Sequence, residues 1–98
     1  MSDFVYVLVN PLRRGRPPFY VGVSIYPKGR FYDHCRDQNS PAYHLLCAFL
    51  KDGLQRDQIL KIYRKCSSRR EALDLEYKLV ISTPNLVNRP YVRGRGYT

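Results

Sequence analysis

Apolar residues gather along the chain in three short runs that predict strands. Residues 4–9, FVYVLV, are all apolar or aromatic and three of them are valine, which favours a strand buried on both faces. Residues 19–23, FYVGV, form a second run after a connection rich in Gly, Pro and Arg, so the two runs predict an antiparallel hairpin. Residues 58–63, QILKIY, predict a third, shorter strand.

Helical patterns fill the segments between the second and third strands. Pro27 suits the first turn of a helix that extends to about residue 37. In the next segment, apolar residues recur at positions i, i+3, i+4, i+7 and i+8, as they do on one face of a helix. Ser40 followed by Pro41 predicts the N-cap and first turn of this helix, and Gly53 predicts its end. The apolar face consists of Ala42, Leu45, Leu46, Phe49 and Leu50.

A last helix and the overall order of elements define the expected fold. Ser68 and Glu71 have the S-x-x-E spacing of a capping box, which predicts a helix over residues 69–81. The order ββααβα predicts an α+β fold in which helices flank a three-stranded antiparallel sheet. Ninety-eight residues suit a single domain, with a core over about residues 4–88 and a basic tail over residues 89–98.

The balance of charges points to a polyanionic partner. The chain has 17 Lys and Arg against eight Asp and Glu, a net charge of +9 and a pI near 9.8. An excess of this size in so small a domain favours nucleic acid, because clustered cations bind the phosphate backbone. The clusters lie in the hairpin loop and in the tail, and they comprise Arg13, Arg14, Arg16, Arg89, Arg93 and Arg95.

Other features narrow the class of protein. No apolar run approaches the roughly 20 residues that span a membrane, and the N-terminus lacks the pattern of a signal peptide. We therefore expect an intracellular protein without a membrane partner. Cys35, Cys47 and Cys66 are odd in number and fit no CxxC spacing, which favours reduced thiols over a disulfide framework or a zinc site.

Glu76 occupies an unusual position on the last predicted helix. On a helical wheel it falls in the middle of an apolar arc, whereas Glu71, Asp74 and Lys78 fall on the opposite side. A carboxylate that faces a core is costly unless a cation or hydrogen-bond donors meet it. The wheel alone leaves two interpretations open: half of a buried Glu–Arg pair, or a metal ligand.

Two further pairs of residues carry weaker signals. Arg30 and His34 are four residues apart and share one face of the first helix, a spacing that is also typical of a solvated basic face. Tyr6 and Tyr20 lie within the first two strands and can project from the same face of an antiparallel pair. Tyrosine is also a common strand residue, so this pair is equally consistent with packing alone.

The order and spacing of these residues together resemble the GIY-YIG endonuclease family. Residues 4–6, FVY, stand where the family has its first triplet, and residues 20–22, YVG, stand for the second. The form FYVG…GRFYDH looks most like the branch of the LEM-3-like nucleases. The remaining family positions are matched by Arg30, His34, Glu76 and Asn88.

The resemblance implies metal-dependent hydrolysis of a DNA phosphodiester. Glu76 then holds Mg²⁺ or Mn²⁺, and Arg30 binds the phosphate in the transition state. Either Tyr6 or Tyr20 deprotonates or orients the attacking water, which requires nearby cations to lower the pKa of that phenol. His34 hydrogen-bonds the phenolate. Asn88 orients the site rather than reacting.

Two positions depart from the family pattern. Phe4 replaces the first glycine, a change that concerns packing. Val23 stands where many members have Lys or Gln, so the charge of that side chain has to come from Lys28 or another basic residue. We expect Lys28 and Arg36 to join the clustered arginines in contacting double-stranded or branched DNA along its backbone.

Two other functions compete with the nuclease. One is a nucleic-acid-binding module of the same fold without activity, against which stands the joint presence of all six family residues. The other is a small RNA-binding protein that stacks bases on exposed tyrosines, whereas Tyr6 lies in an unbroken apolar run. Since one active site cuts one strand at a time, double-strand cleavage calls for a homodimer, a partner protein or two encounters.

Overall fold

A computed structural model describes residues 2–88 of the chain. Three strands and three longer helices follow the expected order ββααβα, and a one-turn helix precedes the third strand. The α+β prediction is therefore confirmed. The elements are β1 (Asp3–Val9), β2 (Pro18–Ser24), α1 (Pro27–Arg36), α2 (Tyr43–Lys51), α3 (Arg56–Ile59), β3 (Leu60–Cys66) and α4 (Arg69–Ser82).

The sheet is antiparallel throughout, with β1 between β2 and β3. The continuous apolar run of β1 suits this central place, because both of its faces are covered. Tyr6 pairs with Gly22 across the hairpin, and Leu8 pairs with Tyr20. Tyr6 and Tyr20 are thus diagonal neighbours on one face of the sheet, as the sequence predicts.

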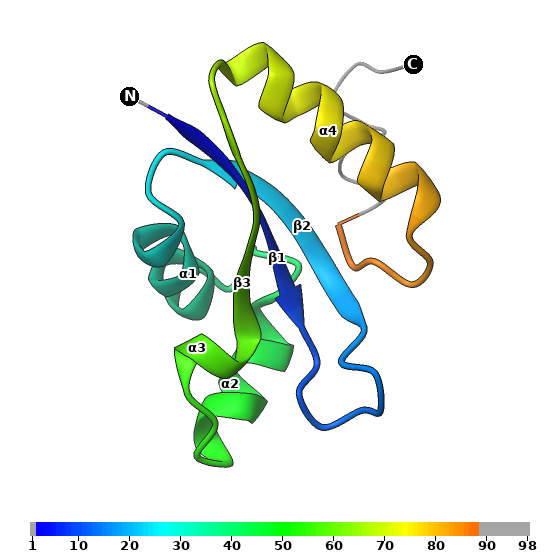
Figure 1. The fold of residues 1–98 in the computed structure, drawn as a ribbon. Helices are drawn as coiled ribbons and strands as arrows, with labels where there is room; N and C mark the ends of the chain where they lie inside the picture. Colours follow the sequence, from blue (N-terminus) through cyan, green and yellow to red (C-terminus); the bar gives the residue numbers. More distant parts are fainter. Residues whose placement is uncertain (1, 89–98) are drawn as a thin grey trace.

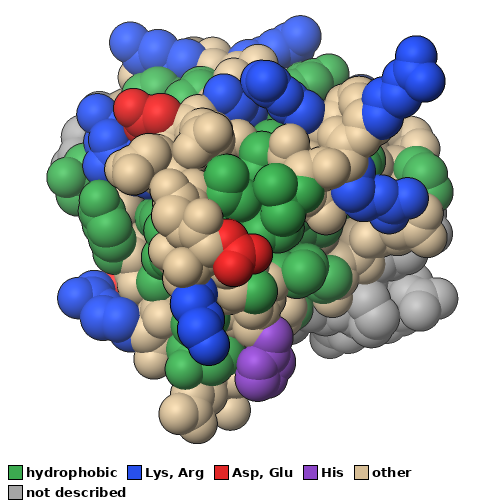
Figure 2. Space-filling view, turned by 90° about the horizontal axis from the view of Figure 1, so that it is seen from below, with side chains coloured by type: hydrophobic (Ala, Val, Ile, Leu, Met, Phe, Trp, Pro, Cys, Tyr) green, Lys and Arg blue, Asp and Glu red, His purple; other side chains and the backbone are tan. Residues whose placement is uncertain are grey.

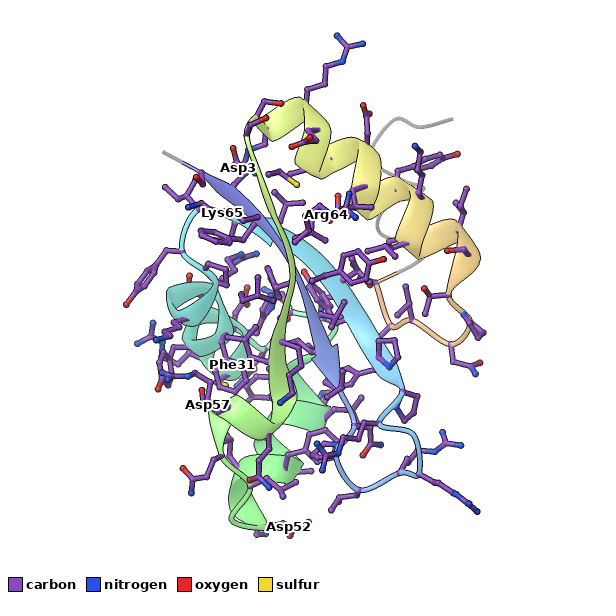
Figure 3. All side chains as sticks on the ribbon, in the orientation of Figure 1. Asp3, Phe31, Asp52, Asp57, Arg64 and Lys65 are labelled. Carbon is purple, nitrogen blue, oxygen red and sulfur yellow. The ribbon has the colours of Figure 1, made fainter. Side chains whose placement is uncertain are left out.

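Figure 1 shows helices on both faces of the sheet, and the side chains of the strands pack in two separate cores. Tyr6, Leu8 and Tyr20 pack with Phe31 of α1 and with residues of α2 and α3, and Figure 3 shows Phe31 between α1 and the strands. Val5 and Val21 point to the other face, where α4 packs. The sheet therefore separates a face covered by α1, α2 and α3 from a face covered by α4.

The outer edge of β2 is covered by the segment that follows α4. The Val87 backbone N–H donates to the Phe19 carbonyl at 2.8 Å. The Asn88 side chain then pairs with the backbone of Val21, in the manner of an added strand residue. Covering an edge in this way satisfies backbone groups that would otherwise be open to another chain.

Two boundaries differ from the sequence prediction. The second helix begins at Tyr43, not at Pro41, and Ser40 is not its N-cap. The Ser40 hydroxyl instead accepts a hydrogen bond from the Ala42 N–H inside the preceding turn. The predicted third strand over residues 58–63 is also displaced: its first two residues close helix α3, and β3 continues to Cys66. Short apolar runs do not separate a helical turn from a strand, which explains this error.

On one face of the described residues the basic side chains are spread apart from one another (Figure 2). Figure 2 shows Lys and Arg side chains around exposed hydrophobic ones on the face formed by the lower ends of the elements in Figure 1. Within residues 2–88, no helix combines the length and the apolar composition that crossing a membrane requires.

Candidate active site

The absence of a side chain at Gly22 makes room for the ring of Tyr6. A Cβ placed on Gly22 would lie 2.5 Å from both Cζ and Oη of Tyr6, closer than real Cβ contacts allow. Tyr6 and Gly22 are direct cross-strand partners, so the Tyr6 ring lies over the backbone of β2. The glycine of the second triplet thus determines where the tyrosine of the first triplet points.

Tyr6, Tyr20 and His34 form a compact group above this part of the sheet. The rings of Tyr6 and Tyr20 are stacked with their centroids 6.1 Å apart, and the Tyr20 ring meets His34 edge-on at 4.6 Å. The Tyr6 hydroxyl lies 3.0 Å from Nε2 of His34, in a buried hydrogen bond. Helix α1 supplies His34, whose side chain is only 2% exposed.

Helix α4 brings Glu76 and Arg69 toward the same region. Glu76 is 3% exposed and lies between Ala72 and Val80 on the buried face of the helix, as the wheel predicts. Arg69 lies two turns earlier on that face, and its guanidinium forms an ion pair with Asp3 at 3.0 Å. Figure 3 shows Asp3 at the start of β1, close to the first turn of α4.

These side chains line one pocket of about 210 Å³, here called the strand-edge pocket. It combines Tyr6 and Tyr20 from one face of the sheet with residues of α4 from the other, so it lies beside the edge strand β2. Arg30 reaches it from α1 and is about half exposed. The lining consists of Tyr6, Tyr20, Gly22, Val23, Arg30, Arg69, Leu73, Glu76 and Asn88.

Asn88 lines the strand-edge pocket and is hydrogen-bonded to the backbone of β2. Its Nδ2 donates to the Val21 carbonyl at 2.6 Å, and its Oδ1 accepts from the Val21 N–H at 3.4 Å. The residue is 1% exposed. With both ends of the amide engaged by the backbone, Asn88 holds the end of the described chain against the strand that carries Tyr20 and Gly22.

Burial shifts the pKa values of Tyr6 and His34. The pKa of His34 is lowered to about 4, first by burial and then by the neighbouring Arg30 guanidinium. Burial also raises the pKa of Tyr6, with the neighbouring Tyr20 adding to the effect, while Arg30 acts in the opposite direction. The sequence reasoning required cations to lower the pKa of the tyrosine that serves as base. At Tyr6 burial outweighs Arg30, so Arg30 alone does not lower this pKa.

The protein should lose stability through His34 as the pH falls from 7 to 5. In this window the unfolded chain, with a histidine pKa of 6.5, binds a proton that folded His34, with a pKa of about 4, does not. Linkage makes this a loss of about 2 kcal/mol of unfolding free energy for the one group. Urea denaturation at both pH values measures it.

Two variants isolate that contribution. His34→Gln should lose correspondingly less stability between pH 7 and pH 5, whereas His44→Gln, at an exposed histidine of α2, should behave like the wild type. A wild type and a His34→Gln variant with the same pH dependence would contradict the assignment.

The structure brings some of the expected residues together and leaves others apart. Tyr6, Tyr20, Arg30, Glu76 and Asn88 line the strand-edge pocket, and His34 contacts it through Tyr6. Of the residues expected to contact DNA, those described are exposed and none lines this pocket: Arg13, Arg14, Arg16, Lys28 and Arg36. Arg89, Arg93 and Arg95 lie outside the described residues.

Two residues of this region, Arg69 and Ser40, were not predicted as site residues from the sequence. Lys28 does not line the pocket with Val23, whereas Arg69, one of the other basic residues, does. The signal was available, because Arg69 precedes Glu76 by seven residues and two helical turns return to the same face. Ser40 contacts His34 at 2.6 Å, and nothing in the sequence indicated this contact.

The chemistry of the strand-edge pocket fits a hard divalent cation. Glu76 offers carboxylate oxygens, and the volume leaves room for water and a phosphate oxygen beside it. Mg²⁺ commonly uses one or two carboxylates and keeps several waters. Within residues 2–88, no group of three or more His, Cys, Asp and Glu side chains is arranged to enclose a metal, so a zinc-type cage is not what this part of the chain offers.

Comparison with known proteins adds one finding to this geometry. No curated protein and no solved structure matches the chain. The family of the GIY-YIG catalytic domain matches residues 3–88, which include every element from β1 to α4 and also Asn88. The chain therefore belongs to the GIY-YIG catalytic domain family.

Proposed function

We propose that the protein is a divalent-metal-dependent endonuclease that hydrolyses phosphodiester bonds of DNA. One observation carries the proposal: residues from β1, β2, α1, α4 and the segment after α4 converge on the strand-edge pocket, with the chemistry that this reaction needs. A phenol, a carboxylate and two guanidinium groups around one opening are typical of an active site, because they can bind a phosphate and activate a water.

The two arginines suit a phosphate in the strand-edge pocket. Among the lining residues two guanidinium groups, of Arg30 and Arg69, stand against the one carboxylate of Glu76. Each guanidinium is about half exposed, although it is paired with Asp33 or Asp3. Guanidinium groups bind phosphate oxygens through charge-assisted hydrogen bonds, which strengthen as negative charge develops in the transition state. The ion pair with Asp3 holds Arg69 in place before the substrate arrives.

Glu76 is the residue that would hold Mg²⁺ or Mn²⁺. A bound divalent cation supplies Lewis-acid stabilisation of the oxygen that leaves phosphorus. Glu76 would hold the cation in the pocket that Arg30 and Tyr6 also line. Asn88 supports this arrangement by fixing the strand beside it.

Tyr6 with His34 is the pair that we assign to the attacking water. Of the two candidate tyrosines, Tyr6 has the hydrogen bond to His34, and Tyr20 packs against both rings. Because burial raises the pKa of Tyr6, a standing phenolate is unfavourable. The phenol has to pass its proton to His34 as it accepts one from the water.

The proposed substrate is double-stranded or branched DNA, and the form FYVG…GRFYDH favours the LEM-3-like branch of the family. The exposed arginines of the β1–β2 loop and the basic residues after position 88 would bind the backbone on either side of the cut. One pocket cleaves one strand at a time, so double-strand cleavage would use a homodimer or a partner protein. We propose an intracellular location, where chromosomal DNA is found.

Incubation with supercoiled plasmid and with a branched DNA tests the proposal. We expect cleavage in Mg²⁺ or Mn²⁺ and none in EDTA, with relaxed circles appearing before linear plasmid. Cleavage that persists undiminished in EDTA would contradict metal-assisted hydrolysis. DNA binding without cleavage under any metal would favour the alternative, a catalytically inactive nucleic-acid-binding module.

A further inference from the structure

The nitrogen of His34 that faces away from Tyr6 has a partner of its own. Nδ1 lies 2.6 Å from the Ser40 hydroxyl oxygen, while Nε2 lies 3.0 Å from the Tyr6 hydroxyl. The same Ser40 oxygen accepts the Ala42 backbone N–H at 3.2 Å. A continuous chain of hydrogen bonds thus runs from β1 through α1 to the turn before α2.

We propose that Ser40 is a positioning residue that holds neutral His34 with its proton on Nδ1, so that the unprotonated Nε2 faces the Tyr6 hydroxyl. Neutral imidazole has one donor and one acceptor, and the partner of one nitrogen selects the role of the other. The inference rests on the proposed function and deepens it.

A second pocket lies beside Ser40 and can take the proton that the Ser40 hydroxyl donates. It has a volume of about 230 Å³ and lies on the side of His34 that faces Ser40, Asp37 and Asn39. Ser40 is half-buried and lines this pocket, which leaves its own O–H free to donate to water there. Tyr20 and Arg30 line both pockets, and His34 lines the second one while its Nε2 contacts the Tyr6 hydroxyl of the first.

The proton transfer balances with these groups. As the water oxygen bonds to phosphorus, one water proton passes to the Tyr6 oxygen, and the Tyr6 proton passes to Nε2. Tyr6 ends neutral, and His34 ends as an imidazolium whose Nδ1–H still donates to Ser40. The positive charge on His34 matches the negative charge gained by the phosphate, and water in the second pocket or the leaving oxygen later takes the proton.

Imidazole ¹⁵N NMR on the full ¹⁵N-labelled chain tests the tautomer without any need for activity. The chain has two histidines, so a His34→Gln spectrum assigns the signals, and exposed His44 serves as internal comparison. We expect the His34 proton on Nδ1 in the wild type and in Ser40→Thr, and a mixture of tautomers in Ser40→Ala. A wild type with the proton on Nε2, or an unchanged tautomer in Ser40→Ala, would overturn the inference.

Cleavage kinetics give a second measurement. Ser40→Ala should lower kcat by about 10- to 100-fold, less than the full contribution of a general base, while KM stays the same. Ser40→Thr should restore most of the rate. An unchanged kcat in Ser40→Ala, or a loss that falls on KM alone, would contradict positioning. If Ser40→Ala loses its cooperative thermal transition, Ser40→Cys replaces it, because a thiol is a much weaker acceptor of similar size.

The two measurements separate this inference from the proposed function. A wild type that does not cut DNA would contradict the nuclease, yet its NMR spectrum would still decide the tautomer. A wild type that cuts DNA with its His34 proton on Nε2 would uphold the nuclease and remove Ser40 from its mechanism.

Discussion

Glu76→Ala should abolish DNA cleavage while leaving the fold and DNA binding in place. We expect a loss of about 10³-fold or more, because removing the carboxylate removes the ligand of a cation that supplies several kcal/mol of transition-state stabilisation. DNA binding should stay equal or become tighter, since a negative charge next to the phosphate is gone. Plasmid cleavage in Mg²⁺ and equilibrium binding in EDTA measure the two effects.

Thermal denaturation of the same variant in EDTA separates a metal ligand from a structural ion pair. As a metal ligand, Glu76 shares its pocket with arginines that are about half exposed, so its removal strands no buried charge and stability should stay nearly unchanged. As half of a buried Glu–Arg pair, it would strand an arginine and cost about 3–5 kcal/mol. Asp74→Asn is the matched control, because it removes the same charge from the exposed side of α4. A Glu76→Ala variant that unfolds, or one that cuts at the wild-type rate, refutes the role assigned here.

Gly22→Ala should displace Tyr6 and lower cleavage by about 100-fold. The added Cβ would lie 2.5 Å from Cζ and Oη of Tyr6, so the ring has to leave its place beside His34. A displacement of this kind costs about 100-fold when it takes a reacting group out of alignment. Since the ring is buried, we also expect a loss of about 1–3 kcal/mol in unfolding free energy from overpacking.

Gly29→Ala is the matched control for that change. Its Cβ would also approach a tyrosine ring, that of Tyr26 at 2.6 Å, but Tyr26 is 65% exposed and can swing into solvent. Gly29 lies in α1, where alanine is the better helix former, so this variant should keep or gain stability. If both alanine variants lost equal cleavage rate and equal unfolding free energy, the loss in Gly22→Ala would not come from the displacement of Tyr6.

The parts of the site that lie on strong periodic elements could be predicted from sequence. The buried position of Glu76 followed from the helical wheel, and the shared face of Tyr6 and Tyr20 followed from strand alternation. Both arguments depend only on backbone geometry, which a single element dictates. The same arithmetic places Arg69 on the face of Glu76, although nothing in the sequence says that this end of α4 opens on a pocket.

Features that depend on tertiary contact could not be predicted in this way. The serine–proline pair at residues 40–41 is a common helix start, yet the Ser40 hydroxyl serves His34 and the turn instead. The raised pKa of Tyr6 has the same origin, because the depth at which α1 buries the phenol decides its direction. In both cases a contact outside the local pattern determined the outcome: the contact with His34 for Ser40, and burial against α1 for Tyr6.

The attachment of Asn88 to Val21 has a consequence for the order in which the molecule is made. These residues are 67 positions apart, and closing so long a loop has an entropic cost that only the finished packing repays. A growing chain on the ribosome that has not yet released Asn88 lacks one wall of the strand-edge pocket, even when Tyr6, Arg30 and Glu76 have already emerged. Synthesis from the N-terminus therefore completes this pocket only after Asn88 has emerged, and a chain interrupted before that residue lacks a wall of the pocket on which the proposed cleavage depends.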